Sequence, residues 1–311
     1  MSAVCVGGAP LGSMPENFGH EVGYDEAVHL VQLILDSPVR WIDTANGYSG
    51  GESERRIGAG IAAYGGLPDD FLIATKVDAS GRDYSGPRVR ASVAESQERL
   101  GLEVLPLVYL HDPEFFSFDK MTEPGGAADT LLSLKDEGII GHVGLAGGEV
   151  HEMARYLALG VFEVVLIHNR WTLVDHSAIE LIAQAIDSGL AVINAAIYGG
   201  GILANPTGST NYGYRPAKPE TLQAIADMDR LCRQAGTDLA TAALQASVKD
   251  SRITATIVGL SRPSRLRRIE QSLAAPLSPD VFERLEQLLP PRHSWLDFQP
   301  PRQTIGRGES T

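Results

Sequence analysis

The chain has 311 residues and a formal net charge of −13, from 26 basic and 39 acidic side chains. Because the acidic residues are spread along the chain, nucleic acids and anionic membranes are unfavourable partners. The two cysteines, Cys5 and Cys232, predict neither a disulfide framework nor a thiolate metal site, and the lack of a basic leader or a long apolar run favours a cytoplasmic location.

Short apolar runs alternate with amphipathic helical patterns from one end of the chain to the other, which is typical of a parallel sheet covered by helices. The runs are nearly continuous, as in Val164-Val165-Leu166-Ile167, which suits strands buried on both faces. Eight such runs predict closure into a (β/α)8 TIM barrel of the α/β class. The expected strands are residues 3–6, 39–43, 71–76, 105–111, 141–146, 162–168, 191–197 and 255–260.

Helical periodicity occupies the segments between these runs. The expected helices are residues 24–37, 52–64, 88–100, 128–137, 149–159, 176–188, 220–235 and 239–250. We therefore expect residues 1–290 to form a single barrel domain, followed by an extended tail over residues 291–311. Whether Trp295 and Phe298 of that tail cover the barrel mouth stays open at this point.

Two connections are too long for simple turns, residues 112–126 after the fourth strand and 198–219 after the seventh. Both follow the carboxyl end of a strand, the face on which barrel enzymes carry their active sites. Long loops of this kind are often functional, although simple insertions also occur. We expect aromatic side chains on this face to line a substrate pocket, with packing at the barrel rim as the alternative. The candidates are Phe115, Trp171, Tyr198, Tyr212 and Tyr214.

Four ionisable side chains end or follow the second, third and fourth apolar runs. Lys76 follows Asp43 by 33 residues, and His111 follows Lys76 by 35. Each interval matches one strand-helix-strand unit of about 30 or more residues. Tyr48 lies just after Asp43. Because successive parallel strands end on one face of a barrel, we expect these four side chains to converge.

This set of side chains suits proton transfer coupled to hydride transfer. A carbonyl that accepts hydride needs a proton, and an alcohol that loses hydride must release one. Tyr48 could exchange that proton if the ammonium of Lys76 lowers its pKa from an ordinary value of about 10. Asp43 would hold Lys76, and His111 would orient the reacting oxygen. Such positioned groups typically contribute about 10²–10⁴-fold to the rate.

The four residues resemble the Asp-Tyr-Lys-His set of the aldo-keto reductases. The family's DTAxxY signature stands unaltered at residues 43–48, and residues 51–54 are similar to its G-x-S-E segment. Two additional residues separate Tyr48 from that segment, which predicts a reshaped loop beside the tyrosine. The resemblance runs from Gly7 to about Leu273. It implies a barrel oxidoreductase.

A closer resemblance lies in residues 111–114, 169–178 and 201–204. These segments look like the branch that contains D-threo-aldose 1-dehydrogenase, L-fucose dehydrogenase and pyridoxal dehydrogenase. The resemblance implies hydride transfer between a nicotinamide cofactor and a small polar carbonyl or hydroxyl substrate, first of all an aldose. The alternative within the family is a pyridoxal or general aldehyde or ketone reductase. The alternative from another class is a non-catalytic NAD(P)-binding regulatory subunit.

Cofactor contacts follow from the same resemblance. The nicotinamide carboxamide would lie at Ala146, Gly147 and His168, where the chain departs from the family's usual Ser-Asn pair and glutamine. The adenosine end would lie where a serine and an arginine of the family clamp the 2′-phosphate of NADP. The candidates there are Gly259, Ser261, Arg262, Arg265 and Arg268. A buried structural role for His168 and a solvated helix face for the arginines stay open.

NADP(H) and NAD(H) are both compatible with this sequence, and the oligomeric state is unknown. No metal is expected, because no recognised ligand spacing occurs. A metal-assisted hydrolase or isomerase would have to recruit His111, Asp112, Glu114 and His168.

Overall fold

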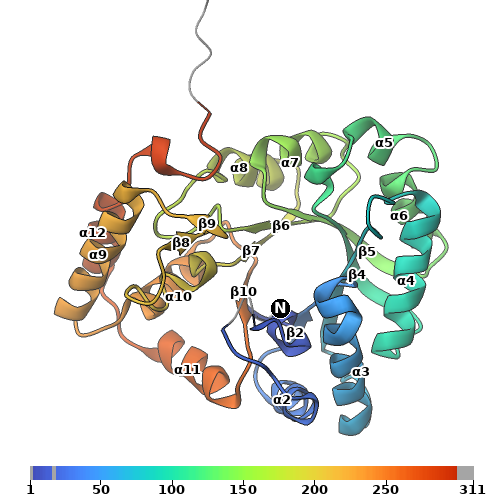
Figure 1. Cartoon of the computed structure of the whole chain (residues 1–311), viewed down its shortest axis with the longest axis horizontal. Helices are drawn as coiled ribbons and strands as arrows, with labels where there is room; N and C mark the ends of the chain where they lie inside the picture. Colours follow the sequence, from blue (N-terminus) through green and yellow to red (C-terminus); the bar gives the residue numbers. More distant parts are fainter. Residues whose placement is uncertain (1–2, 16–18, 300–311) are drawn as a thin grey trace, which may run out of the picture.

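The computed structural model describes residues 3–15 and 19–299. Eight parallel strands form a closed barrel in the order β1-β10-β7-β6-β5-β4-β3-β2, with the helices outside the ring (Figure 1). The strands are β1 Val4–Gly7, β2 Trp41–Asp43, β3 Leu72–Val77, β4 Leu105–His111, β5 Ile140–Gly147, β6 Val164–His168, β7 Ala191–Ala195 and β10 Ala255–Gly259. The predicted TIM barrel is confirmed, with each strand within a few residues of its expected place.

The helices expected between the strands are also present. They are α2 Tyr24–Asp36, α3 Glu52–Tyr64, α4 Gly86–Leu100, α6 Ala127–Asp136, α7 Val150–Leu157, α8 Ile179–Asp187, α9 Pro219–Gln234 and α10 Leu239–Lys249. Elements that the pattern did not predict are α5 Phe118–Thr122, α11 Pro263–Ala274, α12 Pro279–Gln287 and the hairpin of β8 (Asn211–Tyr212) with β9 (Arg215–Pro216). In α11 the buried positions are limited to Leu266, Ile269 and Ser272, so its apolar stripe is too weak to read.

Side-chain alternation along the strands separates two layers of core. In β4, Leu107 and Tyr109 point into the barrel, while Val108 and Leu110 join the layer between sheet and helices. Trp41 of β2 and Ala74 of β3 also lie in the interior cluster.

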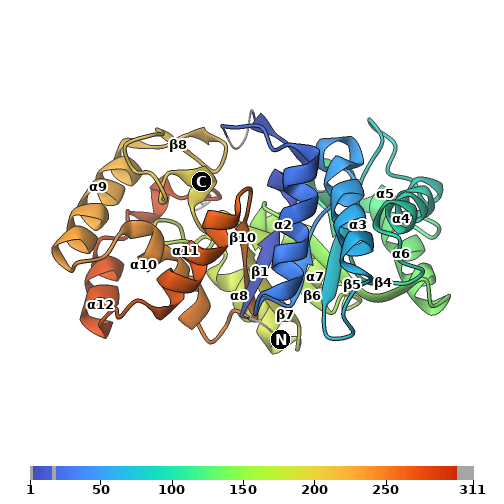
Figure 2. The ribbon, with the colours of Figure 1, turned by 90° about the horizontal axis from the view of Figure 1, so that it is seen from below.

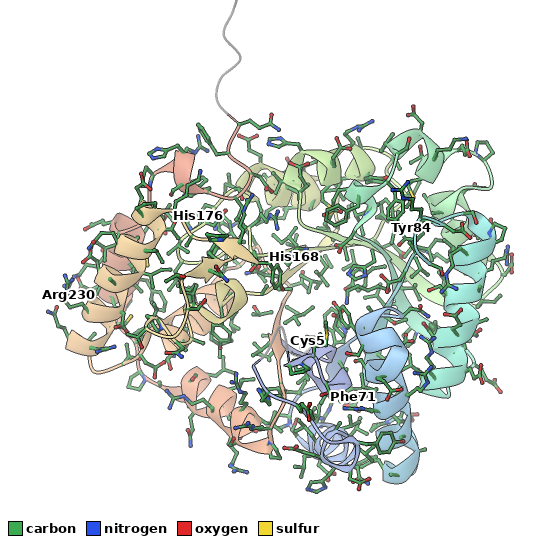
Figure 3. The ribbon with its side chains drawn as sticks, in the orientation of Figure 1. Cys5, Phe71, Tyr84, His168, His176 and Arg230 are labelled. Atoms are coloured by element: carbon green, nitrogen blue, oxygen red, sulfur yellow. The ribbon has the colours of Figure 1, made fainter. Side chains whose placement is uncertain are left out.

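Side chains two residues apart on a strand point to the same face. The residue two positions after each interior side chain therefore also points inward, at the carboxyl end of the strand. The inward positions after Trp41, Ala74 and Tyr109 are Asp43, Lys76 and His111. In β6 the position two residues after Leu166 is His168, which lies near the middle of the ring of strands (Figure 3). The apolar interior thus ends in a polar layer at the barrel mouth.

The two ends of the molecule are built differently. Helix α9 and the β8–β9 hairpin lie at one end, and α4, α5 and α6 lie at the other (Figure 2). Residues 291–299 pack against the loop after β6, because Leu296 N–H donates to Asp175 Oδ2 over 2.7 Å and Arg170 Nε donates to Asp297 Oδ2 over 3.0 Å. The rest of the predicted tail, residues 300–311, lies outside the described residues. Within the described part of the chain, no helix is long and apolar enough to cross a membrane.

Candidate active site

The structure brings Asp43, Tyr48, Lys76 and His111 together at the barrel mouth. Lys76 Nζ donates to Asp43 Oδ1 and to Thr44 O, both over 2.6 Å. The same ammonium lies 4.8 Å from the centre of the Tyr48 ring. The rings of Tyr48 and His111 meet edge to face with centroids 5.9 Å apart. A buried ion pair thus lies directly beside the tyrosine, and the imidazole of His111 packs against the same ring.

Burial sets the protonation of this group. Burial alone would lower the pKa of Lys76, but the charge of Asp43 and its hydrogen bond outweigh burial, so the pKa is raised. Burial raises the pKa of Tyr48, and the charge of Lys76 acts in the opposite direction without outweighing it. The net shift of Tyr48 therefore differs from the expected lowering, because desolvation of a phenolate costs more here than one ammonium recovers. Lys76 is charged, and Tyr48 is a neutral phenol near pH 7.

The loop that carries Tyr48 has an unusual backbone. Residues Tyr48–Gly51 form a 3-10 turn, η2, in which Ser49, Gly50 and Gly51 all take positive φ. A side chain at Gly51 would collide with the guanidinium of Arg99, so this close approach requires glycine. The two additional residues predicted after Tyr48 thus form a left-handed turn that leads directly into α3.

Charged groups of α4 hold the base of this loop. Arg99 Nη1 donates to Asn46 O over 3.0 Å and to the buried Glu54 over 3.1 Å. The side chain of Asn46 donates to Ser92 O and to Glu95 Oε2. Asn46 falls at an unspecified position of the DTAxxY signature, so its part in anchoring the loop is visible only in the structure.

His111 is held by two neighbours that the sequence did not single out. Its Nδ1 lies 2.7 Å from Asp78 Oδ1, and its backbone N–H donates to the Tyr84 hydroxyl over 3.0 Å. Its Nε2 lies 3.8 Å from Asp112 Oδ2. Burial alone would lower the pKa of His111, but the carboxylates of Asp78 and Asp112 outweigh burial, so the pKa is raised.

A second polar group adjoins His111 and extends from the end of β4 to the end of β6. Ligand atoms of Asp112, Glu114 and His168 lie within 4.8 Å of one another. Glu114 Oε1 already accepts the N–H groups of Gly148 and Glu149, so it serves the start of α7. Burial would raise the pKa of Asp112, but His168 and His111 outweigh it and lower this pKa to about 2. Asp112 is therefore a stable carboxylate between two imidazoles.

Comparisons with known proteins identify the family. A model of the Aldo/keto reductase family matches residues 3–290. The chain belongs to this family. L-galactose dehydrogenase of Arabidopsis thaliana is 31% identical over 283 residues, which cover 88% of this chain and 84% of the relative. D-threo-aldose 1-dehydrogenase of a Pseudomonas species is 25% identical over 292 residues, which cover 85% of this chain and 88% of the relative.

Solved structures with a similar fold include aldo-keto reductases. An aldo-keto reductase from Bacillus halodurans, solved in its holo form, superposes with a TM-score of 0.75 at 20% identity, over 93% of this chain and 92% of the other. At that identity the likeness shows the fold alone. With the family match and the named dehydrogenases, this aldo-keto reductase is an oxidoreductase that uses NAD(P)H.

The ends of β5 and β6 have features that fit a nicotinamide amide. Ala146 is buried in the barrel interior, and a side chain at Gly147 would lie 2.5 Å from Glu114 Oε2. His168 is 27% exposed. Asn169 takes a φ of 61° and is fully buried, and its Oδ1 has no hydrogen-bond partner in the described part of the chain. Asn169 Oδ1, a buried acceptor with no partner among the described residues, and the partly exposed imidazole of His168 could accept hydrogen bonds from an amide N–H.

The start of α11 fits the phosphate end of the cofactor. Ser261 is buried at the end of the strand-to-helix turn, and Gly259 ends β10. Arg262 and Arg265 are exposed, and neither forms an ion pair with any residue that the structure describes. Arg268 instead pairs with Asp238, the N-cap residue of α10. Arg262 and Arg265 are therefore two cations without an ion-pair partner in the described part of the chain, whereas Arg268 already has one.

The aromatic candidates divide into two groups. Phe115 and Tyr214 are 78% and 70% exposed, as expected for a rim that can close on a substrate. Tyr198 is half-buried, and burial raises its pKa to about 12.

Tyr212 and Trp171 differ from the expected pocket wall. Tyr212 is 4% exposed and its hydroxyl donates to Asn169 O over 2.6 Å, so it holds the loop after β6 in place. Trp171 donates from Nε1 to Asp250 Oδ2 over 2.9 Å and stacks on His176. It lines a cavity of about 540 Å³ shared with α10, α12 and Trp295.

Proposed function

We propose that this aldo-keto reductase acts as an aldose 1-dehydrogenase, with Tyr48 as the general acid-base. The observation that carries the proposal is the buried Lys76, paired with Asp43 and positioned 4.8 Å from the centre of the Tyr48 ring. No structural need of a barrel requires an ammonium to be buried beside a phenol, and burying a charge is costly unless it is paired. Two relatives named for sugar oxidation support the substrate class.

In this proposal each side chain has a distinct task. When an alcohol is oxidised, its oxygen loses a proton to Tyr48, and when a carbonyl is reduced, Tyr48 returns that proton. Lys76 stabilises the phenolate, and Asp43 keeps Lys76 charged and fixed in place. His111 holds the reacting oxygen by a hydrogen bond. The bound nicotinamide supplies or accepts the hydride.

The residues that would hold the cofactor lie on the opposite side of the mouth. His168 and Asn169 at the end of β6 would bind the carboxamide, and Ser261, Arg262 and Arg265 would bind the phosphate end. Bidentate guanidinium groups suit phosphate, so these arginines support NADP(H) without excluding NAD(H).

The test is a fluorescence titration with NAD, NADP, NADH and NADPH, followed by turnover assays with the tighter pair. The panel contains aldoses, pyridoxal and aromatic aldehydes. Turnover that is highest with an aldose supports the proposal. Turnover confined to pyridoxal or the aromatic aldehydes would contradict an aldose as the substrate and favour a pyridoxal or general aldehyde reductase. Tight cofactor binding with no turnover on any compound would favour a regulatory subunit, and loss of activity with a chelator would favour a metal-assisted reaction.

A further inference from the structure

Asp78 contacts two parts of the barrel mouth, the loop that carries Tyr48 and the side chain of His111. It follows β3, two residues after Lys76, and its side chain is 22% exposed. One carboxylate oxygen, Oδ1, lies 2.7 Å from His111 Nδ1. The other, Oδ2, accepts the backbone N–H of Gly47 over 2.6 Å, next to Tyr48. One carboxylate therefore contacts both the histidine and the tyrosine loop.

The position of Asp78 is itself fixed. Its backbone N–H donates to Ser92 Oγ over 3.1 Å, and its carbonyl accepts from Arg88 Nε over 3.1 Å. Both partners belong to α4, whose Arg99 anchors Asn46 at the base of the tyrosine loop. A side chain at Gly47 would lie 2.9 Å from Asp78 Oδ2, so the close approach depends on glycine. The contact between Asp78 and Gly47 thus depends both on α4, which fixes Asp78, and on the glycine at position 47.

We propose that Asp78 is a positioning residue for the reaction: it couples the Tyr48 loop to His111 and sets which nitrogen of His111 faces the reacting oxygen. This inference rests on the proposed function of the same site. A carboxylate accepts a hydrogen bond, so Nδ1 of His111 carries the proton, and Nε2 is left to face the substrate. Nε2 can donate to a carbonyl or alkoxide oxygen only when His111 is the charged imidazolium.

The charged groups around His111 decide whether it is charged. Asp78 after β3, Asp112 after β4 and Asp43 of β2 favour the imidazolium. Lys76 of β3 opposes it, and the neutral Tyr48 of η2 packs edge to face against its ring. The carboxylates outweigh Lys76 and burial, so the pKa of His111 is raised above its ordinary value of about 6.5. Carbonyl reduction therefore slows as pH rises through the pKa of His111.

The experiment compares the wild-type chain with Asp78→Asn and Asp78→Glu. Histidine-labelled protein is titrated by NMR to follow the pKa and tautomer of His111, and kcat for carbonyl reduction is measured across the same pH range. In Asp78→Asn the pKa of His111 falls, the upper limb of the pH profile moves to lower pH, and kcat near pH 7 drops about tenfold with little change in KM. Asp78→Glu retains the negative charge but not the geometry. Its His111 pKa should therefore lie closer to the wild-type value than its kcat does.

Asp83→Asn is the matched control, because Asp83 lies in the same loop and accepts from Ser85 N–H rather than from the histidine. It should leave the titration of His111 unchanged. The inference is overturned if Asp78→Asn leaves both the His111 pKa and the pH profile at wild-type values, or if Asp83→Asn moves them equally. The NMR titration needs no turnover, so an enzyme inactive on every substrate would overturn the proposed function while this arm still decides the role of Asp78.

Discussion

The two sides of the barrel mouth differ in how their charges are used. On the β2–β4 side the ionisable groups pair with one another, and Lys76 and Asp43 are only 2% and 5% exposed. On the β10–α11 side Arg268, which pairs with Asp238, is 60% exposed, and its partner is 44% exposed. One side of the mouth is thus preorganised for a reaction, while the other keeps its cations accessible to a ligand.

Strained backbone, by contrast, occurs on both sides of the mouth, because Ser49 beside Tyr48 takes a φ of 51°. Asp112, Asn169 and Ala196 follow β4, β6 and β7 with φ values of 44°, 61° and 52°. Positive φ in residues other than glycine costs of order 1–3 kcal/mol and is often found at ligand-binding sites. The strand ends therefore place groups at the mouth at a cost in stability.

The largest effect is expected where charges are buried. Lys76→Met leaves Asp43 without its partner, so the free energy of unfolding should fall by about 3–5 kcal/mol, and turnover should be lost. Denaturant unfolding measures the first quantity. In the double variant Asp43→Asn with Lys76→Met both charges are removed, and part of the stability should return. A double variant no more stable than Lys76→Met alone would contradict the view that pairing maintains this side of the mouth.

An intermediate effect is expected at the accessible cations. Arg262→Ala and Arg265→Ala should each weaken NADPH binding about tenfold and NADH binding much less, because a charged hydrogen bond to the 2′-phosphate is removed. Fluorescence titration of both nucleotides gives the ratio. Arg267→Ala is the matched control on the same exposed helix. An equal loss in Arg267→Ala would show that general positive charge, rather than a phosphate site, is responsible.

The smallest effect separates two tyrosines of one loop. Tyr212→Phe should lower the free energy of unfolding by about 1 kcal/mol, since it removes the buried hydroxyl bonded to Asn169 and Thr172. Tyr214→Phe should change stability less, because this ring is exposed at the rim, and Tyr214→Ala should raise KM. If Tyr212→Phe alters KM for the sugar without a change in stability, the assignment of Tyr212 to the loop interior is wrong.

Much of the reacting side could be predicted from sequence because it follows the strand period. Asp43, Lys76 and His111 each lie two residues after an interior side chain, so alternation alone turns them toward the mouth. Asp78 lies on a loop without periodicity, and its partner Gly47 contributes only a backbone N–H, which no side-chain pattern reveals. Tyr212 and Tyr214 lie two residues apart in the sequence. Their opposite burial depends on the hairpin and on a φ of 67° at Tyr214.

In the proposed mechanism, Tyr48 exchanges the substrate proton beside the Lys76–Asp43 pair. The most direct measurement is kcat of Tyr48→Phe with the best substrate, together with its Kd for the cofactor. Removal of the hydroxyl should lower kcat by about 10²–10⁴-fold while cofactor binding is retained. A Tyr48→Phe protein that binds the cofactor normally and keeps full turnover would contradict the account.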